Sequence, residues 1–226
     1  MKKIDLALAL CGVLAACNVS ALTIDNFNTT QSNKTVTNGA VVDRPINTSG
    51  AGVTYIGTSR TLSSRAAVGT SSSTEARINV APNLSALHMN NIGSAGTVYV
   101  EWNGISGSAS DFTEGGISSQ FRINLPAPLT TSVSVAFLVN GTEEKTKIYL
   151  SGTSAYADFA FASFTTPNLF TNVTTLRMTM TGVASEPGWS ATFGDVETVP
   201  LAVPLPGTLM LVGIGLAGLA RSAKRA

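Results

Sequence analysis

Apolar and polar residues alternate along most of the chain between residues 22 and 199, and a period of two predicts β-strands with one buried face. In residues 97–102 the apolar side chains fall on one face of the predicted strand and the polar side chains on the other. Residues 133–139 and 146–150 repeat the pattern, and Asn140-Gly141 between them is a strong hairpin motif. Further short strands are predicted over residues 53–56, 60–68, 76–80, 84–89, 117–125, 155–161, 174–181 and 189–196.

Many short strands without an amphipathic helix predict an all-β fold, a single β-sandwich of the jelly-roll or lectin-like type over residues 22–199. No repeat of fixed period is present in the sequence, which argues against a solenoid or a propeller. The charged residues that follow the hairpin turn predict a solvated edge strand; they are Glu143, Glu144, Lys145 and Lys147.

Residues 1–21 have the three parts of a secretory signal peptide. Lys2 and Lys3 after the first methionine supply the positive n-region, and residues 6–16 form the apolar stretch. The small residues Val19-Ser20-Ala21 precede a cleavage site after Ala21. The apolar stretch is too short to span a bilayer. We therefore expect export through the Sec pathway, with one alternative left open: Leu14-Ala15-Ala16-Cys17 resembles a bacterial lipobox, in which Cys17 becomes the lipidated first residue.

Residues 200–226 form a second terminal segment with three parts. They are the proline motif Val203-Pro204-Leu205-Pro206-Gly207, the apolar residues 208–220, and a basic end with Arg221, Lys224 and Arg225. The prolines break a strand, the apolar run inserts into a bilayer, and the basic end stays on the cytoplasmic side as a stop signal. Residues 205–220 give about 24 Å of helix at ~1.5 Å per residue, slightly less than the usual ~20-residue span. We therefore expect a transmembrane helix that anchors the protein only temporarily.

This tail resembles the PEP-CTERM class of sorting signals, specifically its VPLPA variant. It differs from that variant in having Gly207 in place of alanine, and from the commoner form in having Leu205 in place of glutamate. The resemblance implies that an exosortase at the inner membrane recognises the tail and cleaves at or near the proline motif. It also implies delivery to the cell surface or extracellular matrix, with exopolysaccharide or other matrix components as partners.

The charge and the cysteine and histidine content of the domain between the terminal segments exclude several classes of function. Residues 22–206 contain nine Lys and Arg against twelve Asp and Glu, a net charge of −3, and the basic residues form no stripe. Nucleic-acid binding is therefore disfavoured. Both cysteines, Cys11 and Cys17, lie in the leader, and His88 is the single histidine. Thiol catalysis, disulfides and multi-histidine metal sites are therefore not expected after cleavage at Ala21.

Candidate catalytic groups are few. Hydrolysis of sugars needs two carboxylates roughly 5–9.5 Å apart, and the candidates are Glu101, Asp111 and Glu114. No glycosidase motif accompanies them, and no G-x-S-x-G elbow accompanies His88, so we assign no catalytic residue and expect no enzyme activity. No cofactor is expected either, although loop oxygens around Asp111 and Glu114, or near Asp158, are candidate ligands for Ca²⁺.

Aromatic residues offer the clearest candidates for carbohydrate contact, because their faces stack on sugar rings. The candidates are Trp102, Tyr156 and Trp189. We expect Trp102 in the core, because it alternates with buried valines, and Trp189 in an exposed loop after Pro187-Gly188. The sequence thus predicts an exported, non-enzymatic cell-surface or extracellular-matrix protein associated with exopolysaccharide or a biofilm. A carbohydrate-binding module is the first alternative, and a secreted glycoside hydrolase or other hydrolase is the least favoured one.

Overall fold

The computed structural model describes residues 21–32, 36–37, 41–47, 55–65, 73–81, 84–92, 96–183 and 189–200. Within these ranges only the backbone is described for Ser32, Pro167 and residues 36–37, 41–47, 73–81 and 84–92. The predicted signal-peptide core and the predicted transmembrane helix lie outside the described residues.

Fifteen strands account for most of the described residues. They are β1 (Thr23–Asp25), β2 (Gln31–Ser32), β3 (Val36–Thr37), β4 (Val41–Asn47), β5 (Ser59–Arg65), β6 (Ser73–Ala81), β7 (Leu84–Ile92), β8 (Thr97–Asn103), β9 (Gln120–Leu125), β10 (Val133–Val139), β11 (Glu143–Tyr149), β12 (Ala155–Ala160), β13 (Thr175–Gly182), β14 (Trp189–Phe193) and β15 (Val196–Val199). Three short 3₁₀ helices join them: η1 (Gly107–Ser110), η2 (Phe161–Ser163) and η3 (Pro167–Thr171). No helix in this part of the chain has the length and apolar content to cross a membrane.

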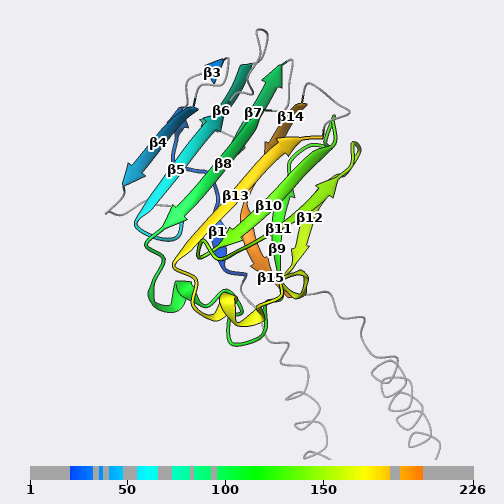
Figure 1. Cartoon of the computed structure of the whole chain (residues 1–226). Coiled ribbons are helices and arrows are strands. Elements are labelled where there is room, and N and C mark those ends of the chain that lie inside the picture. Colours follow the sequence, from blue (N-terminus) through cyan, green and yellow to red (C-terminus); the bar gives the residue numbers. More distant parts are fainter. Residues whose placement is uncertain are drawn as a thin grey trace, which may run out of the picture.

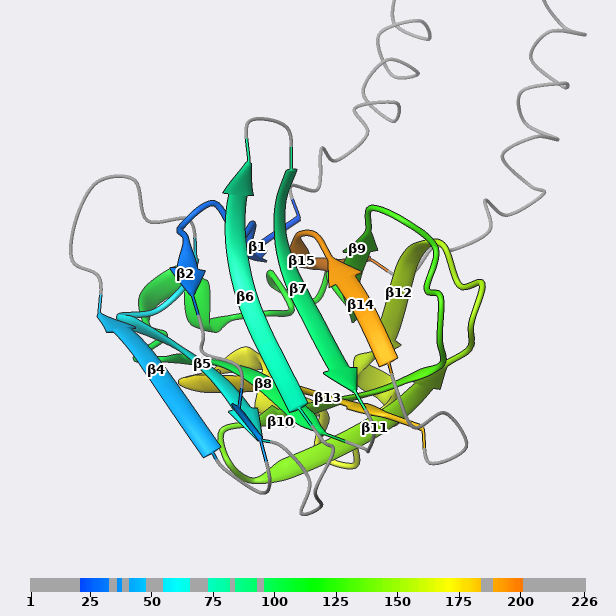
Figure 2. The ribbon, with the colours of Figure 1, turned by 90° about the horizontal axis from the view of Figure 1, so that it is seen from above.

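The strands form two facing layers (Figures 1 and 2). One layer is a six-stranded antiparallel sheet with the order β11-β10-β13-β8-β5-β4. The other consists of a four-stranded sheet, β1-β15-β9-β12, and a five-stranded sheet in which β14-β7-β6-β2 is extended by β3 beside β6. The chain passes between these two sheets where β14 leads into β15, and there the backbone of Asn124 bonds to both Gly194 and Asp195. The predicted all-β sandwich is confirmed.

Most of the predicted strands are found, with three corrections. In the predicted strand 53–56, the described residues Tyr55 and Ile56 form no strand, and Tyr55 makes only an isolated bridge to Asp25. Residues 189–196 were expected to form one strand but form β14 and β15, because Gly194-Asp195 turns the chain into the neighbouring sheet. The edge strand β4 was not predicted. It contains Pro45, which lacks the N–H of a strand ladder and is tolerated because β4 lies at the edge of its sheet. The predicted hairpin at Asn140-Gly141 joins β10 to β11, and both residues have positive φ, 52° and 64°.

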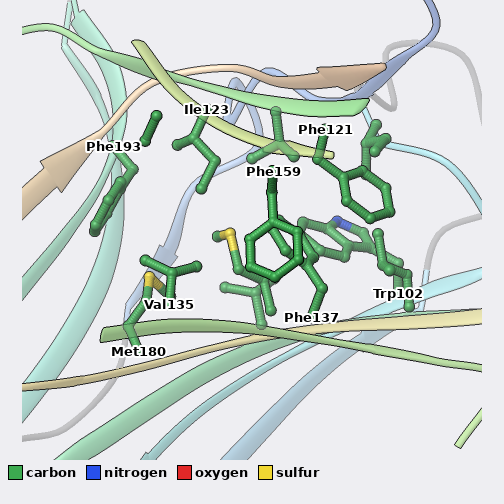
Figure 3. Packing of buried hydrophobic residues seen from close by; sticks show 14 of the residues in the cluster. Trp102, Phe121, Ile123, Val135, Phe137, Phe159, Met180 and Phe193 are labelled. Carbon is green, nitrogen blue, oxygen red and sulfur yellow. The ribbon is translucent and has the colours of Figure 1, made fainter. Parts of the chain in front are cut away.

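The core lies between the six-stranded sheet and the opposite layer (Figure 3). Alternate residues of β8, β10 and β13 point inward and are fully buried, as the period of two predicted. Phenylalanines from both layers meet there: Phe121 of β9 stacks on Phe137 of β10 with ring centroids 4.3 Å apart. Phe161 and Phe170, from η2 and η3, stack at 4.0 Å and close one end of the core. Truncating such a ring to alanine typically costs about 3–5 kcal/mol.

A buried ion pair joins the N-terminal strand to the opposite layer. The side chains of Asp25 on β1 and Arg60 on β5 are both 0% exposed, and Arg60 Nη1 donates to Asp25 Oδ1 at 3.0 Å and Oδ2 at 2.8 Å. The remaining nitrogens of Arg60 also have acceptors, because Nε donates to Gln31 Oε1 at 3.0 Å and Nη2 to the carbonyl of Thr29 at 2.5 Å. A guanidinium can be buried when its donors and its charge are satisfied in this way.

The Asp25 carboxylate accepts two further hydrogen bonds. The indole Nε1 of Trp102 donates to its Oδ2 at 2.8 Å, and the backbone N–H of Phe27 donates to its Oδ1 at 2.7 Å. Burial raises the pKa of the Asp25 carboxyl, and the Arg60 guanidinium and these hydrogen bonds oppose that shift. The Arg60 guanidinium also lies 4.7 Å from the ring centroid of Tyr55. The network therefore fixes β1, and with it the neighbouring β15, against the six-stranded sheet.

Candidate functional site

The three aromatic candidates do not form a common platform. Trp102 lies in the core, as expected, with its indole bonded to Asp25. Trp189 was expected to be exposed, and this is wrong: it begins β14, is 1% exposed, and donates from Nε1 to the carbonyl of Gly96 at 3.3 Å. Gly182 explains the burial, because a Cβ at that position would collide with the indole. Tyr156 is the one candidate in solvent, at 51% exposed.

Tyr156 belongs to a polar surface on the outer side of the four-stranded sheet. We call this surface the β12–β9–β15 face, after the strands that supply Tyr156, Asp158, Arg122, Asn124 and Glu197; its sixth residue, Asp195, directly precedes β15. Strand register sets their arrangement: Asp158 lies opposite Arg122, which lies opposite Glu197, and Tyr156 lies opposite Asn124. The backbone of Asn124 in turn bonds to Asp195. The six residues thus form two adjacent rows across three strands.

Arg122 organises this face. Its Nε donates to Asp158 Oδ1 at 2.8 Å and its Nη2 to Asp158 Oδ2 at 3.0 Å, a bidentate ion pair. The guanidinium also lies 4.5 Å from the ring centroid of Tyr156, so it supports the ring from one side. The backbone carbonyl of Asp158 accepts bonds from Lys147 Nζ and from the Tyr149 hydroxyl, which tie the edge of this sheet to β11.

The face carries more negative than positive charge. The six residues have three carboxylates and one guanidinium, and the guanidinium is paired with Asp158. With the Lys147 ammonium, which contacts the carbonyl of Asp158 at the edge of the face, the net charge is −1. Among the described residues, the carboxylates of Asp195 and Glu197 have neither a hydrogen-bond donor nor a salt bridge within contact distance. Partial burial raises the pKa of both groups, and the neighbouring carboxylates add to the rise for Glu197, against the opposing effect of Arg122.

The carboxylates considered for catalysis lie elsewhere. Glu101, on the outer face of the six-stranded sheet, is paired with Arg177 Nη2 at 2.5 Å. Asp111 and Glu114 line a pocket of about 450 Å³ whose described lining also includes Leu22 but not Glu101. The pKa of Asp111 is lowered by hydrogen bonds from its own loop, the Thr113 hydroxyl first, which is the opposite of what a general acid needs.

The remaining candidate residues are His88 and the proposed calcium ligands. His88 lies in β7, for which the structure describes only the backbone. Within the described ranges, no three Asp, Glu, His or Cys side chains gather closely enough to hold a metal ion. Asp158, a candidate calcium ligand, has both carboxylate oxygens bonded to Arg122. The calcium hypothesis therefore gains no support from the arrangement of these residues.

The C-terminal segment was compared with known protein families. Residues 202–225 match the model of the PEP-CTERM protein-sorting motif. The chain carries a PEP-CTERM sorting motif. The predicted resemblance is thus confirmed for a segment that includes Val203 to Gly207 and the basic residues 221–225. Only residues 200 and 201 separate this PEP-CTERM motif from Val199, the last residue of β15.

The domain before the PEP-CTERM motif was compared with curated proteins and with solved structures. The search of the curated proteins gives no match. Among the solved structures, the family 11 carbohydrate-binding module of the cellulosomal cellulase Lic26A-Cel5E of Clostridium thermocellum aligns with 81% of this chain and 96% of its own length. The aligned sequences are 12% identical and the TM-score is 0.37.

Proposed function

We propose that this chain is an exported, non-enzymatic protein of the cell surface or extracellular matrix, sorted and cleaved by an exosortase. The PEP-CTERM motif at residues 202–225 is the observation that carries the proposal, because this motif belongs to proteins exported and held at the membrane before processing. The predicted signal peptide ending at Ala21 supports the same route. The C-terminal helix would insert into the membrane only until the tail is removed.

The position of the motif relative to the fold supports processing of a folded domain. The last paired residue, Val199, precedes the proline motif, so cleavage at Pro204 or Pro206 would leave every described strand in place. The part that remains is the sandwich, for which we propose the jelly-roll or lectin-like class. Exopolysaccharide or another matrix polymer is its proposed partner.

A structural or binding role is favoured over catalysis by the state of the candidate carboxylates. Glu101 is engaged by Arg177, and Asp111 accepts hydrogen bonds from its own loop. Neither arrangement leaves a free acid opposite a free base, which hydrolysis of a glycosidic bond requires. We therefore propose no enzymatic role for these residues.

The proposal is tested in the source bacterium by intact mass and terminal peptide mapping of protein from the medium, the cell surface and the membranes. We expect a released form that begins at Leu22 and ends near Pro206. The double variant Pro204→Ala/Pro206→Ala should keep residues 221–226 and remain in the membrane fraction. Pro200→Ala is the matched control, because it removes a nearby proline outside the matched motif and should be processed normally.

Two results would overturn this proposal. One is a wild-type chain that keeps residues 221–226 in every fraction, since no exosortase would then have cleaved it. The other is a mature chain that begins at a lipidated Cys17 and stays in the membrane, which would make the protein a lipoprotein. Deleting the exosortase gene of the same strain gives an independent check, because the wild-type chain should then accumulate uncleaved.

A further inference from the structure

The β12–β9–β15 face has the composition of a ligand-binding surface rather than of an inert sheet exterior. Its guanidinium is already committed to Asp158, whereas Asp195 and Glu197 have no cationic partner within contact distance among the described residues. Both carboxylates are also partly desolvated by the sheet, and an additional cation there would relieve their mutual repulsion. An excess of unpaired negative charge on a rigid, ordered face favours a cationic partner.

The second feature of the face is its aromatic ring. Tyr156 is half exposed and the Arg122 guanidinium lies over one side of its ring, so the remaining surface of the ring is available for contact with the apolar side of a flat ligand. Strands lie about 4.8 Å apart and alternate residues roughly 6.7 Å apart, so the two rows cover an area of about 10 Å by 7 Å. This area accommodates a short stretch of an extended polymer, with Asn124 between the ring and the acids to accept and donate hydrogen bonds.

From this juxtaposition we infer that the β12–β9–β15 face binds a polysaccharide that carries free amino groups, with a sugar ring against Tyr156 and a sugar ammonium beside Asp195 and Glu197. The inference rests on the proposed function in one respect, because export to the cell surface or matrix is what would bring the protein into contact with such a polymer. Each part of the ligand matches a part of the face: the apolar side of the pyranose ring matches the tyrosine, and the ammonium matches the unpaired carboxylates.

The charge of the face disfavours other polymers. A polyuronate, a nucleic acid or an anionic bilayer would bring negative charge toward a surface whose net charge is already −1, with Asp195 and Glu197 at the end away from Lys147. A fully acetylated polysaccharide would stack on Tyr156 but would leave Asp195 and Glu197 without a counterion. A lysine-rich peptide would match the acids but not the aromatic ring, and it is therefore included in the test.

The test uses the full chain, expressed with its own leader and purified in a polyoxyethylene detergent, since sugar-based detergents would compete. Binding is measured by calorimetry at about pH 6, where an amine is protonated and carboxylates are largely ionised. The probes are the β-1,4-linked glucosamine hexamer, its N-acetylated counterpart, a galacturonate hexamer and hexalysine. We expect the glucosamine hexamer to bind at least about tenfold more tightly than the other three probes. The N-acetylated and galacturonate hexamers lack the charge-assisted hydrogen bond to the acids, and hexalysine lacks the ring that stacks on Tyr156.

Variants separate the contribution of the aromatic ring from that of the two carboxylates. Tyr156→Ala should weaken binding of the glucosamine hexamer without changing that of hexalysine, and Asp195→Asn/Glu197→Gln should weaken binding by about tenfold or more. Glu144→Gln is the matched control, because it removes an exposed carboxylate from β11, outside this face, and should bind like the wild type. Thermal unfolding of each variant shows whether it is folded, and Tyr156→Phe, which keeps the ring, should retain binding.

The inference is overturned if the glucosamine hexamer does not bind, or if Asp195→Asn/Glu197→Gln binds it as tightly as the wild type. It is also overturned if hexalysine binds as tightly as the glucosamine hexamer and Tyr156→Ala has no effect, since the face would then be a general cation surface. These outcomes concern purified protein and do not depend on sorting. Failure of the proposed function would instead be seen as an unprocessed tail in the source bacterium.

Discussion

Replacement of Arg60 by methionine would test whether the buried ion pair acts as one unit. Methionine retains much of the aliphatic volume but loses the donors that bond to Asp25, Gln31 and Thr29. The Asp25 carboxylate would keep its bond from Trp102 but lose its counterion in a site without solvent. Breaking a buried pair by removing one partner typically costs about 3–5 kcal/mol, and we expect Arg60→Met to lower the free energy of unfolding by that amount.

The second substitution removes the isolated charge. In the Arg60→Met background, Asp25→Asn replaces the buried carboxylate with a neutral amide whose oxygen still accepts one hydrogen bond. The double variant should therefore be more stable than Arg60→Met alone by about 2 kcal/mol, even though it carries one more substitution. The partly exposed pair of Arg177 with Glu101 is the control, because Arg177→Met should cost no more than about 1 kcal/mol.

Urea unfolding followed by tryptophan fluorescence measures these free energies, since both tryptophans are buried and Trp102 contacts the pair directly. The dependence of the unfolding free energy on urea should stay constant across the set, so that shifts of the midpoint report stability. The single variant Asp25→Asn completes the set. If the losses of unfolding free energy in the two single variants add up to the loss in the double variant to within about 0.5 kcal/mol, the two side chains are not coupled and the reasoning fails.

Three further changes test other parts of the fold. Asn140→Ala should destabilise by about 2 kcal/mol and Asn140→Gly by about 1 kcal/mol in urea unfolding, because both lose side-chain bonds but only alanine is strained at φ 52°. Hydrogen bonds from Thr165 lower the pKa of Glu143 to about 2 in the folded protein. The ionised Glu143 therefore stabilises the fold fully at pH values above its unfolded-state pKa near 4.5, and this contribution is lost as the pH falls toward 2. Glu143→Gln should therefore lose less stability than the wild type between pH 5 and pH 2, and an equal loss would refute that role. Gly182→Ala should lower the thermal midpoint, because its methyl group collides with Trp189; an unchanged midpoint would contradict the packing.

The strand pattern was predictable because burial follows the alternation closely. In β8 the side chains of Val98, Val100 and Trp102 are buried while their neighbours are partly exposed, and β13 follows the same rule. The hairpin at Asn140-Gly141 was predictable for a local reason, since both positions need the left-handed conformation. The local sequence, over a few consecutive residues, was therefore sufficient to predict these strands and this hairpin.

The remaining features depend on contacts between distant residues. Trp189 follows turn residues and gives no local indication of burial; the space it fills is provided by Gly182, on a different sheet. Arg60 lies at an inward position of β5, where a charged residue by itself suggests an error in the strand register. Its counterion, Asp25, is 35 residues away, and no spacing rule links the two. Of the β12–β9–β15 face, the sequence indicated only Tyr156, as a candidate sugar contact, and Asp158, as a candidate calcium ligand. Strand pairing brings the other members together.

The pairing of β1 with β15 connects the fold to the processing of the chain. These strands are antiparallel, and the N–H of Thr198 donates to the carbonyl of Leu22 at 2.9 Å, so the first and last strands of the sandwich begin and end at the same place. Leu22, which follows the predicted cleavage site, and Thr198, four residues before the PEP-CTERM motif, therefore lie side by side. Each end is secured inside its cleavage site, Leu22 by β15 and Val199 by Ser119. Because β1 is also fixed to the opposite layer through Asp25, removal of both terminal segments would leave the fold, and the β12–β9–β15 face beside it, unchanged.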